Sequence, residues 1–291
     1  MSSLLHPFTP RHGFLLVLVA ACGFGLTPLF SRLLFAEGFN PEMAMLSRFV
    51  LPAVLLVGFL PTAFRQPGRA TLAMGSGAFM GVGVIAYFEA MAVLPVALTT
   101  LIYFSYPLFT ALLGRVLFGL PLSRADALGC GAVLIASVLM LGAPGELSAT
   151  QSRALWLAFL APLAFAVLIL VNAHCLNAMA TLPRYAAGIW GAFLVALVVN
   201  TWITPAPVGL PGSPIGWLAL LGMGILASML PQLLFTVGAP AAGPNRTALA
   251  GSAELLLGLL TGWLLLAEAV EPAQVLGGLL IGGALWLGAR S

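Results

Sequence analysis

Charge is the first thing that this sequence lacks. Only 7% of its 291 residues are charged, and all eleven basic residues are arginine, so the chain has no lysine. A soluble domain contains about 25% charged residues, whereas 61% of this chain is hydrophobic. We therefore expect an integral membrane protein that is solvated by lipid. The absence of lysine also excludes a Schiff base with retinal, which requires a lysine amine.

Residues that bind metals or catalyse reactions are equally scarce. The chain has one aspartate, three histidines and three cysteines, with no HExxH or CxxC spacing among them. Cys22, Cys130 and Cys175 lie inside apolar runs, which is typical of small core residues. No GxxxxGKS/T loop is present, so ATP-driven work would require another subunit. We expect no enzyme activity, no catalytic residue, no metal and no cofactor.

Hydropathy divides the chain into ten apolar segments with short connections. A helix requires about 20 residues to cross the hydrocarbon of a bilayer, and the segments come close to that length. We therefore predict an all-α integral membrane fold with ten transmembrane helices. Their predicted ranges are 13–34, 42–60, 72–93, 97–117, 124–141, 154–175, 184–203, 215–235, 245–266 and 273–289.

The arginines are distributed unevenly between the two ends of these helices. If the N-terminus is cytoplasmic, the cytoplasmic face collects Arg11, Arg65, Arg69, Arg115, Arg124, Arg184, Arg246 and Arg290. The opposite face then has only Arg32, Arg48 and Arg153. An excess of arginine is the usual sign of the cytoplasmic face. We predict a multi-pass protein of the plasma (inner) membrane with both termini in the cytoplasm.

Two long segments superpose without a gap when the sequence is shifted by 148 residues. TTLIYFSYPLFTALLGRVLFGLPLSRADALG, from Thr99, then lies over TALAGSAELLLGLLTGWLLLAEAVEPAQVLG, from Thr247. The shift is close to half the chain, which indicates two five-helix units, 1–143 and 144–291. Because five is an odd number, the second unit must enter the membrane from the opposite side. We therefore predict an inverted repeat, an architecture common among secondary transporters.

The first unit contains GFGLTPLFSRLL, NPEMAMLSRFV and AYFEAMAVLPVALTTLIYFSYPLFTALLGRVLFG, and the second ends in PNRTALAGSAELLLGLLTGWLLLAEAVEPAQVLGGLLIGGALWLG. Over nearly the whole chain these segments resemble the EamA-type drug/metabolite transporters. Two positions depart from that pattern, because Leu255 replaces a proline after Glu254 and Leu120 replaces the exit glutamate of the first unit. The resemblance implies a ten-helix exporter of small metabolites, similar to the YddG-type aromatic amino-acid exporters.

Polar residues inside membrane helices are costly and mark a water-accessible interior. The predicted helix 97–117 has a polar and aromatic stripe along one face, and the 148-residue shift gives the helix 245–266 an equivalent stripe. Tyr106 and Glu254 are then repeat partners near mid-membrane. Two such stripes would meet between the repeats and line a solute cavity, although helix packing is the alternative interpretation. The stripes are Thr99, Tyr103, Tyr106 and Thr110, and Thr247, Gly251, Glu254 and Gly258.

Other features of the spans add candidates for the transport path. Glu254 could bind the solute, carry a proton, or remain a protonated structural residue, since burial disfavours its charged form. Glu89 could pair with Arg48, and this pair would either fix helix packing or open as a gate. Four prolines, at 28, 107, 162 and 231, would interrupt their helices and free backbone carbonyls. The predicted substrate cavity consists of Thr27, Tyr87, Thr99, Tyr103, Tyr106, Asn172, Trp190, Gln232, Ser252 and Glu254.

These observations predict a secondary transporter that moves a small organic solute by alternating access. The tyrosines and Trp190 favour an aromatic or large neutral amino acid as the exported solute. Another metabolite, a drug-like cation, or a structural membrane protein that transports nothing are the alternatives. The expected partners are the solute and membrane lipids. The small arginine excess does not indicate nucleic acid, and we expect a monomer or weak homodimer.

Overall fold

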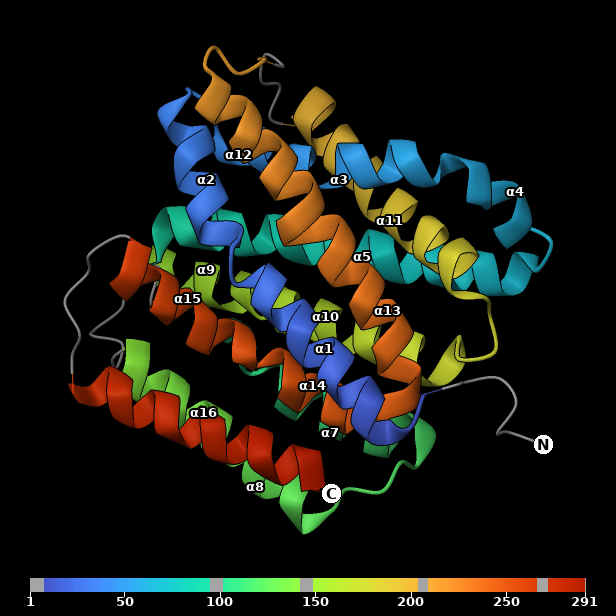
Figure 1. The fold of residues 1–291 in the computed structure, drawn as a ribbon, viewed down its shortest axis with the longest axis vertical. Coiled ribbons are helices and arrows are strands. Elements are labelled where there is room, and N and C mark those ends of the chain that lie inside the picture. The colour runs from blue at the N-terminus through green and yellow to red at the C-terminus, as the bar shows by residue number, and fades with distance from the viewer. Residues whose placement is uncertain (1–7, 95–101, 142–148, 204–208, 266–271, 291) are drawn as a thin grey trace.

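Figure 1 shows the computed structural model of the chain, which describes residues 8–94, 102–141, 149–203, 209–265 and 272–290. Every regular element within these ranges is helical, and the helices group into ten segments that correspond to the predicted spans. The all-α fold is therefore confirmed. Thr99, one of the predicted cavity residues, lies outside the described residues.

Several of the ten segments are divided into shorter helices. The first five are α1 (Pro10–Phe24) with α2 (Thr27–Ala36); α3 (Pro41–Leu56) with η1 (Val57–Phe59) and α4 (Leu60–Ala63); α5 (Pro67–Val93); α7 (Tyr106–Phe118); and α8 (Arg124–Leu141). The next three are α9 (Ala149–Ala158) with α10 (Leu160–Leu170) and η2 (Val171–Cys175); α11 (Thr181–Val198) with η3 (Val199–Ile203); and α12 (Pro214–Gly224) with η4 (Ile225–Met229) and α13 (Leu230–Ala242). The last two are α14 (Pro244–Gly251) with α15 (Ala253–Leu265), and α16 (Pro272–Arg290).

The starts of two helices are determined by residues directly before and within the first turn. Asn40 accepts a hydrogen bond from the Met43 backbone N–H (2.8 Å) before α3, and the Ser213 hydroxyl accepts one from the Gly216 N–H (3.0 Å) before α12. Each cap is followed at once by a proline, whose missing N–H is no loss in the first turn of a helix. The end of α13 is harder to predict, because that helix continues through Pro240 to Ala242, beyond the predicted limit at 235.

The four prolines predicted to interrupt helices do so. Pro28, Pro107 and Pro231 are each the second residue of the helix that follows a break, and Pro162 is the third residue of α10. A proline in the first turn of the second half removes no hydrogen bond that the helix needs. The sequence therefore encodes broken membrane helices, which in transporters are tolerated where the backbone lies inside the protein.

The outer surface of the helical domain is strongly apolar. Six helical segments in the described part of the chain are long and apolar enough to cross a membrane. Trp202 is 82% exposed and Trp156 75% exposed, and both lie near segment ends, where tryptophans sit at membrane interfaces. Such side chains would be unfavourable in water and are suited to lipid. The chain is a multi-pass membrane protein.

The packing of the segments repeats between the two halves. The first segment packs along the eighth through α1 and α13, and its repeat partner, the sixth, packs along the third through α9, α10 and α5. The fifth and tenth segments, α8 and α16, lie side by side, and α7 of the fourth packs on α14 of the ninth (Figure 1). These are the pairings that two copies of one unit would make about a shared axis. The division into 1–143 and 144–291 falls outside the described residues and stays a prediction.

The fourth and ninth segments also break at equivalent positions. α7 begins at Tyr106, directly after Ser105, and α15 begins at Ala253, directly after Ser252. The 148-residue shift maps 105 onto 253, so the two breaks coincide within one residue. Both helix starts lie near mid-membrane, which is where secondary transporters place their broken helices.

Candidate functional site

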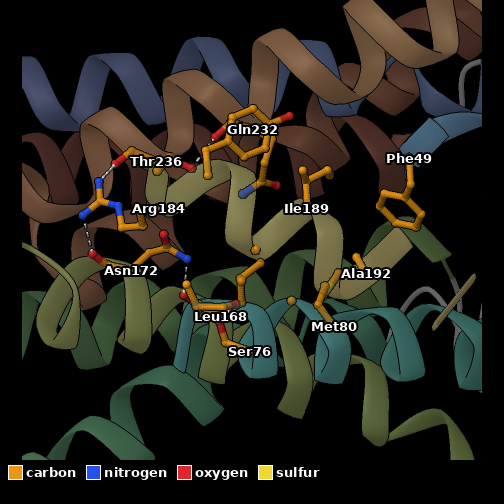
Figure 2. Close-up of a pocket in the computed structure, with 14 residues that line it drawn as sticks. Phe49, Ser76, Met80, Leu168, Asn172, Arg184, Ile189, Ala192, Gln232 and Thr236 are labelled. Atoms are coloured by element: carbon orange, nitrogen blue, oxygen red, sulfur yellow. Dashed lines mark hydrogen bonds between the residues drawn. The ribbon is translucent and has the colours of Figure 1, made fainter. Parts of the chain in front are cut away.

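A cavity of about 50 Å³ lies between helices of both halves, namely α3, α5, α10 with η2, α11 and α13. Figure 2 shows that one side of this cavity is polar and the other apolar. The polar side is formed by Asn172, Arg184, Gln232 and Thr236, and the apolar side by Phe49, Met80, Ile189 and Ala192. The structure thus brings the predicted residues Asn172 and Gln232 together at one cavity.

Arg184 is the charged residue of this cavity wall and is only 2% exposed. Its guanidinium donates to the backbone carbonyls of Leu176 (2.7 Å), Asn172 (3.5 Å) and Thr236. Leu176 follows the end of the sixth segment, and its carbonyl also accepts from the Met179 N–H (3.0 Å). One side chain therefore holds the sixth, seventh and eighth segments together, while its Nε has no partner among the described residues.

The sequence analysis counts Arg184 among the cytoplasmic arginines, and the structure shows that its side chain is buried rather than exposed at that end of the helix. The residue lies in the first turns of α11 and is buried, because the carbonyls at the end of the preceding segment draw its guanidinium inward. Hydrogen bonds from the terminal nitrogens to these carbonyls offset part of the cost of burying the charge. The sequence did contain a sign of this burial, because Arg184 is the first residue of the predicted span 184–203 and does not lie in the connection before it.

Three of the hydroxyl and amide groups around the cavity donate to backbone carbonyls. The Asn172 amide donates to the Leu168 carbonyl (3.0 Å), and the Thr236 hydroxyl donates to the Gln232 carbonyl (2.7 Å), each one turn back. Across the cavity, the Tyr185 hydroxyl donates to the carbonyl of Met229 in η4 (3.3 Å). The accepting carbonyls belong to α10, α13 and η4.

An aromatic cluster lies beside the cavity, with Tyr103 at its centre. The Tyr103 ring centre is 5.7 Å from that of Tyr87, 5.5 Å from that of Tyr106 and 5.8 Å from that of Phe165. Phe165 in turn stacks on Phe235 at 5.9 Å. The cluster joins the third, fourth, sixth and eighth segments and includes the three predicted cavity tyrosines. Tyr87 and Tyr103 keep part of their surface exposed.

Tyr106 marks the crossing of the fourth and ninth segments. It is fully buried, and its hydroxyl lies 3.5 Å from that of Ser252, which is also fully buried. Thr110 and Thr247 of the two stripes are likewise buried, and their hydroxyls donate to the carbonyls of Tyr106 (2.9 Å) and Ala239 (3.4 Å). These four side chains are buried in helix packing and do not line the cavity of Figure 2.

Arg48 and Glu254 interact electrostatically across the boundary between the two halves. The Arg48 guanidinium lies over the Phe24 ring, 5.6 Å from its centre. Gly25, the next residue, packs on the first turn of α15, where an added Cβ would come within 3.3 Å of the Glu254 carbonyl. Arg48 and Glu254 therefore both lie next to the break between α1 and α2. Both side chains keep part of their surface exposed.

The sequence analysis suggested that Glu89 could pair with Arg48, and among the described residues the structure does not bring the two together. Glu89 is exposed, because α5 turns Ala86 and Ala90 inward at this point and Glu89 outward. Among the described residues, the carboxylate that acts on Arg48 is that of Glu254. The spacing along the sequence gave no indication of this pair, since 206 residues separate its members.

Thr27 and Trp190 complete the predicted set. The Thr27 hydroxyl oxygen, at the start of α2, is buried and has no partner in the described part of the chain. The Trp190 indole N–H donates to the Ala53 carbonyl of α3 (2.9 Å), and its ring meets that of Phe193 edge-on. Trp190 therefore fastens the seventh segment to the second, beside the cavity rather than in its wall.

Comparison with known proteins identifies the fold. A family model described as the EamA-like transporter family matches residues 11–142 and again residues 152–289. The chain belongs to the EamA-like transporter family. As an EamA-like transporter it is a member of the drug/metabolite transporter superfamily, which moves metabolites and drugs across membranes, and it is not an enzyme. The repeated match agrees with the repeated packing of the two halves.

A solved structure is similar to this EamA-like transporter along its length. That chain, described only as a crystal structure of a protein, covers 94% of this chain and is itself covered to 95%, with a TM-score of 0.80 and 19% sequence identity. At this identity the similarity shows the fold alone. Among curated proteins, none matches the chain.

Proposed function

We propose that this EamA-like transporter exports aromatic or large neutral amino acids by alternating access, in the manner of the YddG-type exporters. Its two five-helix units would exchange roles as a central cavity opens to one side of the membrane and then to the other. Arg184 and Arg48 lie within the helical domain and are left out of the count of arginines at the two faces. Without Arg184, seven of the eight arginines remain on the side of the termini, and without Arg48, two of the three remain on the opposite side. That bias supports cytoplasmic termini.

The observation that carries the proposal is the position of the cavity between the halves. Its wall combines α5 of the first half with α10, α11 and α13 of the second, so a relative movement of the halves would change its access. The polar side, with Asn172, Arg184 and Gln232, suits the passage of a polar solute (Figure 2). The apolar side and the adjoining aromatic cluster suit a large side chain.

The size of the cavity fits a closed step of such a cycle. A volume of about 50 Å³ admits a few water molecules, whereas pockets that hold small ligands measure about 300–1,000 Å³. In the proposed cycle the halves must separate to admit the solute. The breaks at Gly25, Ser105 and Ser252 would allow one part of a segment to move while the other stays packed.

A drug-like cation is the second candidate solute. Glu254 and the tyrosine rings favour it, because carboxylates and aromatic faces attract cations. Arg48 and Arg184 oppose it, because they place two positive charges beside the same path. An amino acid carries charges of both signs and is compatible with all three residues, so we favour it.

Solute counterflow into proteoliposomes tests the proposal. The purified chain is reconstituted with an unlabelled solute inside, and uptake of the same labelled solute is followed for aromatic, large neutral and small amino acids and for organic cations. We expect transient accumulation of aromatic and large neutral amino acids above that in protein-free liposomes. Accumulation of cations but of no amino acid would replace the proposal by the second candidate, and no accumulation at all would refute both.

Glu254 is the candidate for proton coupling, and Glu254→Gln tests this role in the same preparation. A coupling group would give a variant whose solute exchange, measured at a saturating solute concentration, no longer responds to a pH gradient. A rate and pH response equal to those of the unchanged protein would leave Glu254 without a part in coupling.

A further inference from the structure

We propose that Arg48 and Glu254 form a recognition site for the zwitterionic backbone of an α-amino acid, with Arg48 binding the carboxylate and Glu254 the ammonium group. This inference rests on the proposed function and specifies which chemical groups of the solute are read. It is carried by the depth of the two charges, by their separation and by the groups around them.

The two residues lie at similar depth although they come from opposite halves. Arg48 is seven residues from the start of α3, and Glu254 is ten residues from the start of α14. At about 1.5 Å per residue these distances are about 10 Å and about 15 Å. The second and ninth segments begin on opposite sides of a hydrocarbon layer about 30 Å thick. The two charges therefore lie near mid-membrane, at heights that differ by only about 5 Å.

The two charges attract each other but do not touch. Within the described ranges no ion pair within 4.0 Å joins them, and neither side chain has a hydrogen bond to a described residue. A guanidinium has five N–H donors and a carboxylate has about four acceptor positions. Leaving these groups unpaired inside a membrane domain is costly. A solute with a carboxylate at one end and an ammonium group at the other would satisfy both.

The surroundings supply the remaining contacts of such a site. Tyr103 is an electrostatic neighbour of both Arg48 and Glu254 and is the centre of the aromatic cluster, so a bound aromatic side chain would lie against it. The buried Thr27 hydroxyl, without a partner in the described part of the chain, begins α2 at the same helix break as Phe24. It offers a further hydrogen bond to the solute backbone.

A site of this kind discriminates against solutes that lack one of the two charged groups, because such a solute leaves one charged side chain of the site without a partner. An amine without a carboxylate would leave Arg48 unsatisfied, and a carboxylate without an amine would leave Glu254 unsatisfied. A site built to bond a polar group strongly rejects an analogue that lacks it. Hydrogen bonds to charged groups correspond to a factor of about 10–150 in affinity. Both analogues should therefore bind at least about tenfold more weakly than the amino acid.

The relative affinities of phenylalanine and the two analogues can be measured by competition with the exchange of labelled L-phenylalanine in proteoliposomes. The competitors are unlabelled L-phenylalanine, 3-phenylpropionate, which lacks the amine, and phenethylamine, which lacks the carboxylate. Arg48→Gln should weaken competition by phenylalanine about 10–100-fold and leave that by phenethylamine unchanged. Glu254→Gln should weaken phenylalanine similarly and leave 3-phenylpropionate unchanged. Arg153→Gln and Glu42→Gln, at the ends of their segments, are the matched controls and should behave as the unchanged protein.

Charge-preserving variants keep the test decisive if a glutamine variant fails to fold. Arg48→Lys and Glu254→Asp should both retain a preference for phenylalanine over the two analogues. If phenylalanine exchanges but the analogues compete equally well, or if both glutamine variants weaken all three competitors alike, the zwitterion site is refuted while amino-acid transport stands. If no amino acid exchanges at all, both proposals fall.

Discussion

The phenol oxygen of Tyr106 occupies the space beside Gly251 in which any other residue would place its Cβ. A Cβ at Gly251 would lie 2.6 Å from this oxygen, whereas the next nearest atom, Cζ of the same ring, would be 3.5 Å away. Tyr106 begins α7 and Gly251 ends α14, so one contact sets how closely the fourth and ninth segments cross. This crossing lies between the two halves of the chain.

Gly251→Ala should therefore destabilise the protein by about 1–3 kcal/mol, as overpacked cores do. In a Tyr106→Phe background the clashing oxygen is absent, so the same change should cost less than about 1 kcal/mol. Thermal unfolding of the four proteins in one detergent gives the comparison. Equal losses in both backgrounds would show that the phenol oxygen does not limit the crossing.

The approach of α5 to α11 depends on glycine in the same way. A Cβ at Gly191 would lie 2.0 Å from the Met74 carbonyl oxygen, a backbone atom that cannot move aside. Gly191→Ala should therefore cost about 3 kcal/mol or more. Gly75→Ala is the control, because a Cβ there meets nothing within 4 Å and alanine favours the helix by up to about 1 kcal/mol. Similar losses of stability in thermal unfolding for Gly191→Ala and Gly75→Ala would contradict close backbone packing of α5 on α11.

Arg184→Met should remove the donor of three buried carbonyls while keeping most of the side-chain volume. Each buried group left without a partner costs about 1–3 kcal/mol, so we expect a loss of at least about 2 kcal/mol in thermal or denaturant unfolding. Arg65→Gln, at an exposed position, should change stability by no more than about 0.5 kcal/mol. An Arg184→Met protein as stable as this control would show that the guanidinium does not join the three segments.

Glu37, between the first two segments, links them to the start of the eighth. The Ser213 hydroxyl, with the backbone N–H groups of Gly212 and Ser213, holds the pKa of the Glu37 carboxyl below its ordinary value near 4.5. A lowered pKa stabilises the fold above the ordinary value, and this contribution disappears as pH falls through the lowered one. The unchanged protein should therefore unfold at a higher temperature than Glu37→Gln at pH 6. The difference should shrink as the pH falls below 4.5 and through the lowered pKa, and a constant difference would contradict the link.

Much of the fold could be predicted because its signals are local. Hydropathy gives the ten segments, and the prolines at 28, 107, 162 and 231 mark the starts of the second halves of broken helices. The 148-residue shift predicts two related halves, and the equivalent breaks at Ser105 and Ser252 agree with it.

The site was less predictable because it depends on contacts across the fold. The stripe from Tyr103 to Thr110 assumes one continuous helix, yet the break before Tyr106 changes the helical phase, so Tyr103 faces the aromatic cluster while Thr110 is packed away. Arg184 pairs with backbone carbonyls, which no residue pattern reveals. Arg48 meets Glu254 only because the halves fold against each other.

Access to the cavity from the two sides of the membrane tests alternating access most directly. Gln232→Cys, in a protein whose Cys22, Cys130 and Cys175 are replaced by serine, places one thiol at the cavity of Figure 2. A membrane-impermeant maleimide is applied to inside-out or right-side-out vesicles, with or without phenylalanine. Alternating access predicts labelling from both sides, slowed by phenylalanine on each. Labelling from one side only, unaffected by phenylalanine, would contradict it.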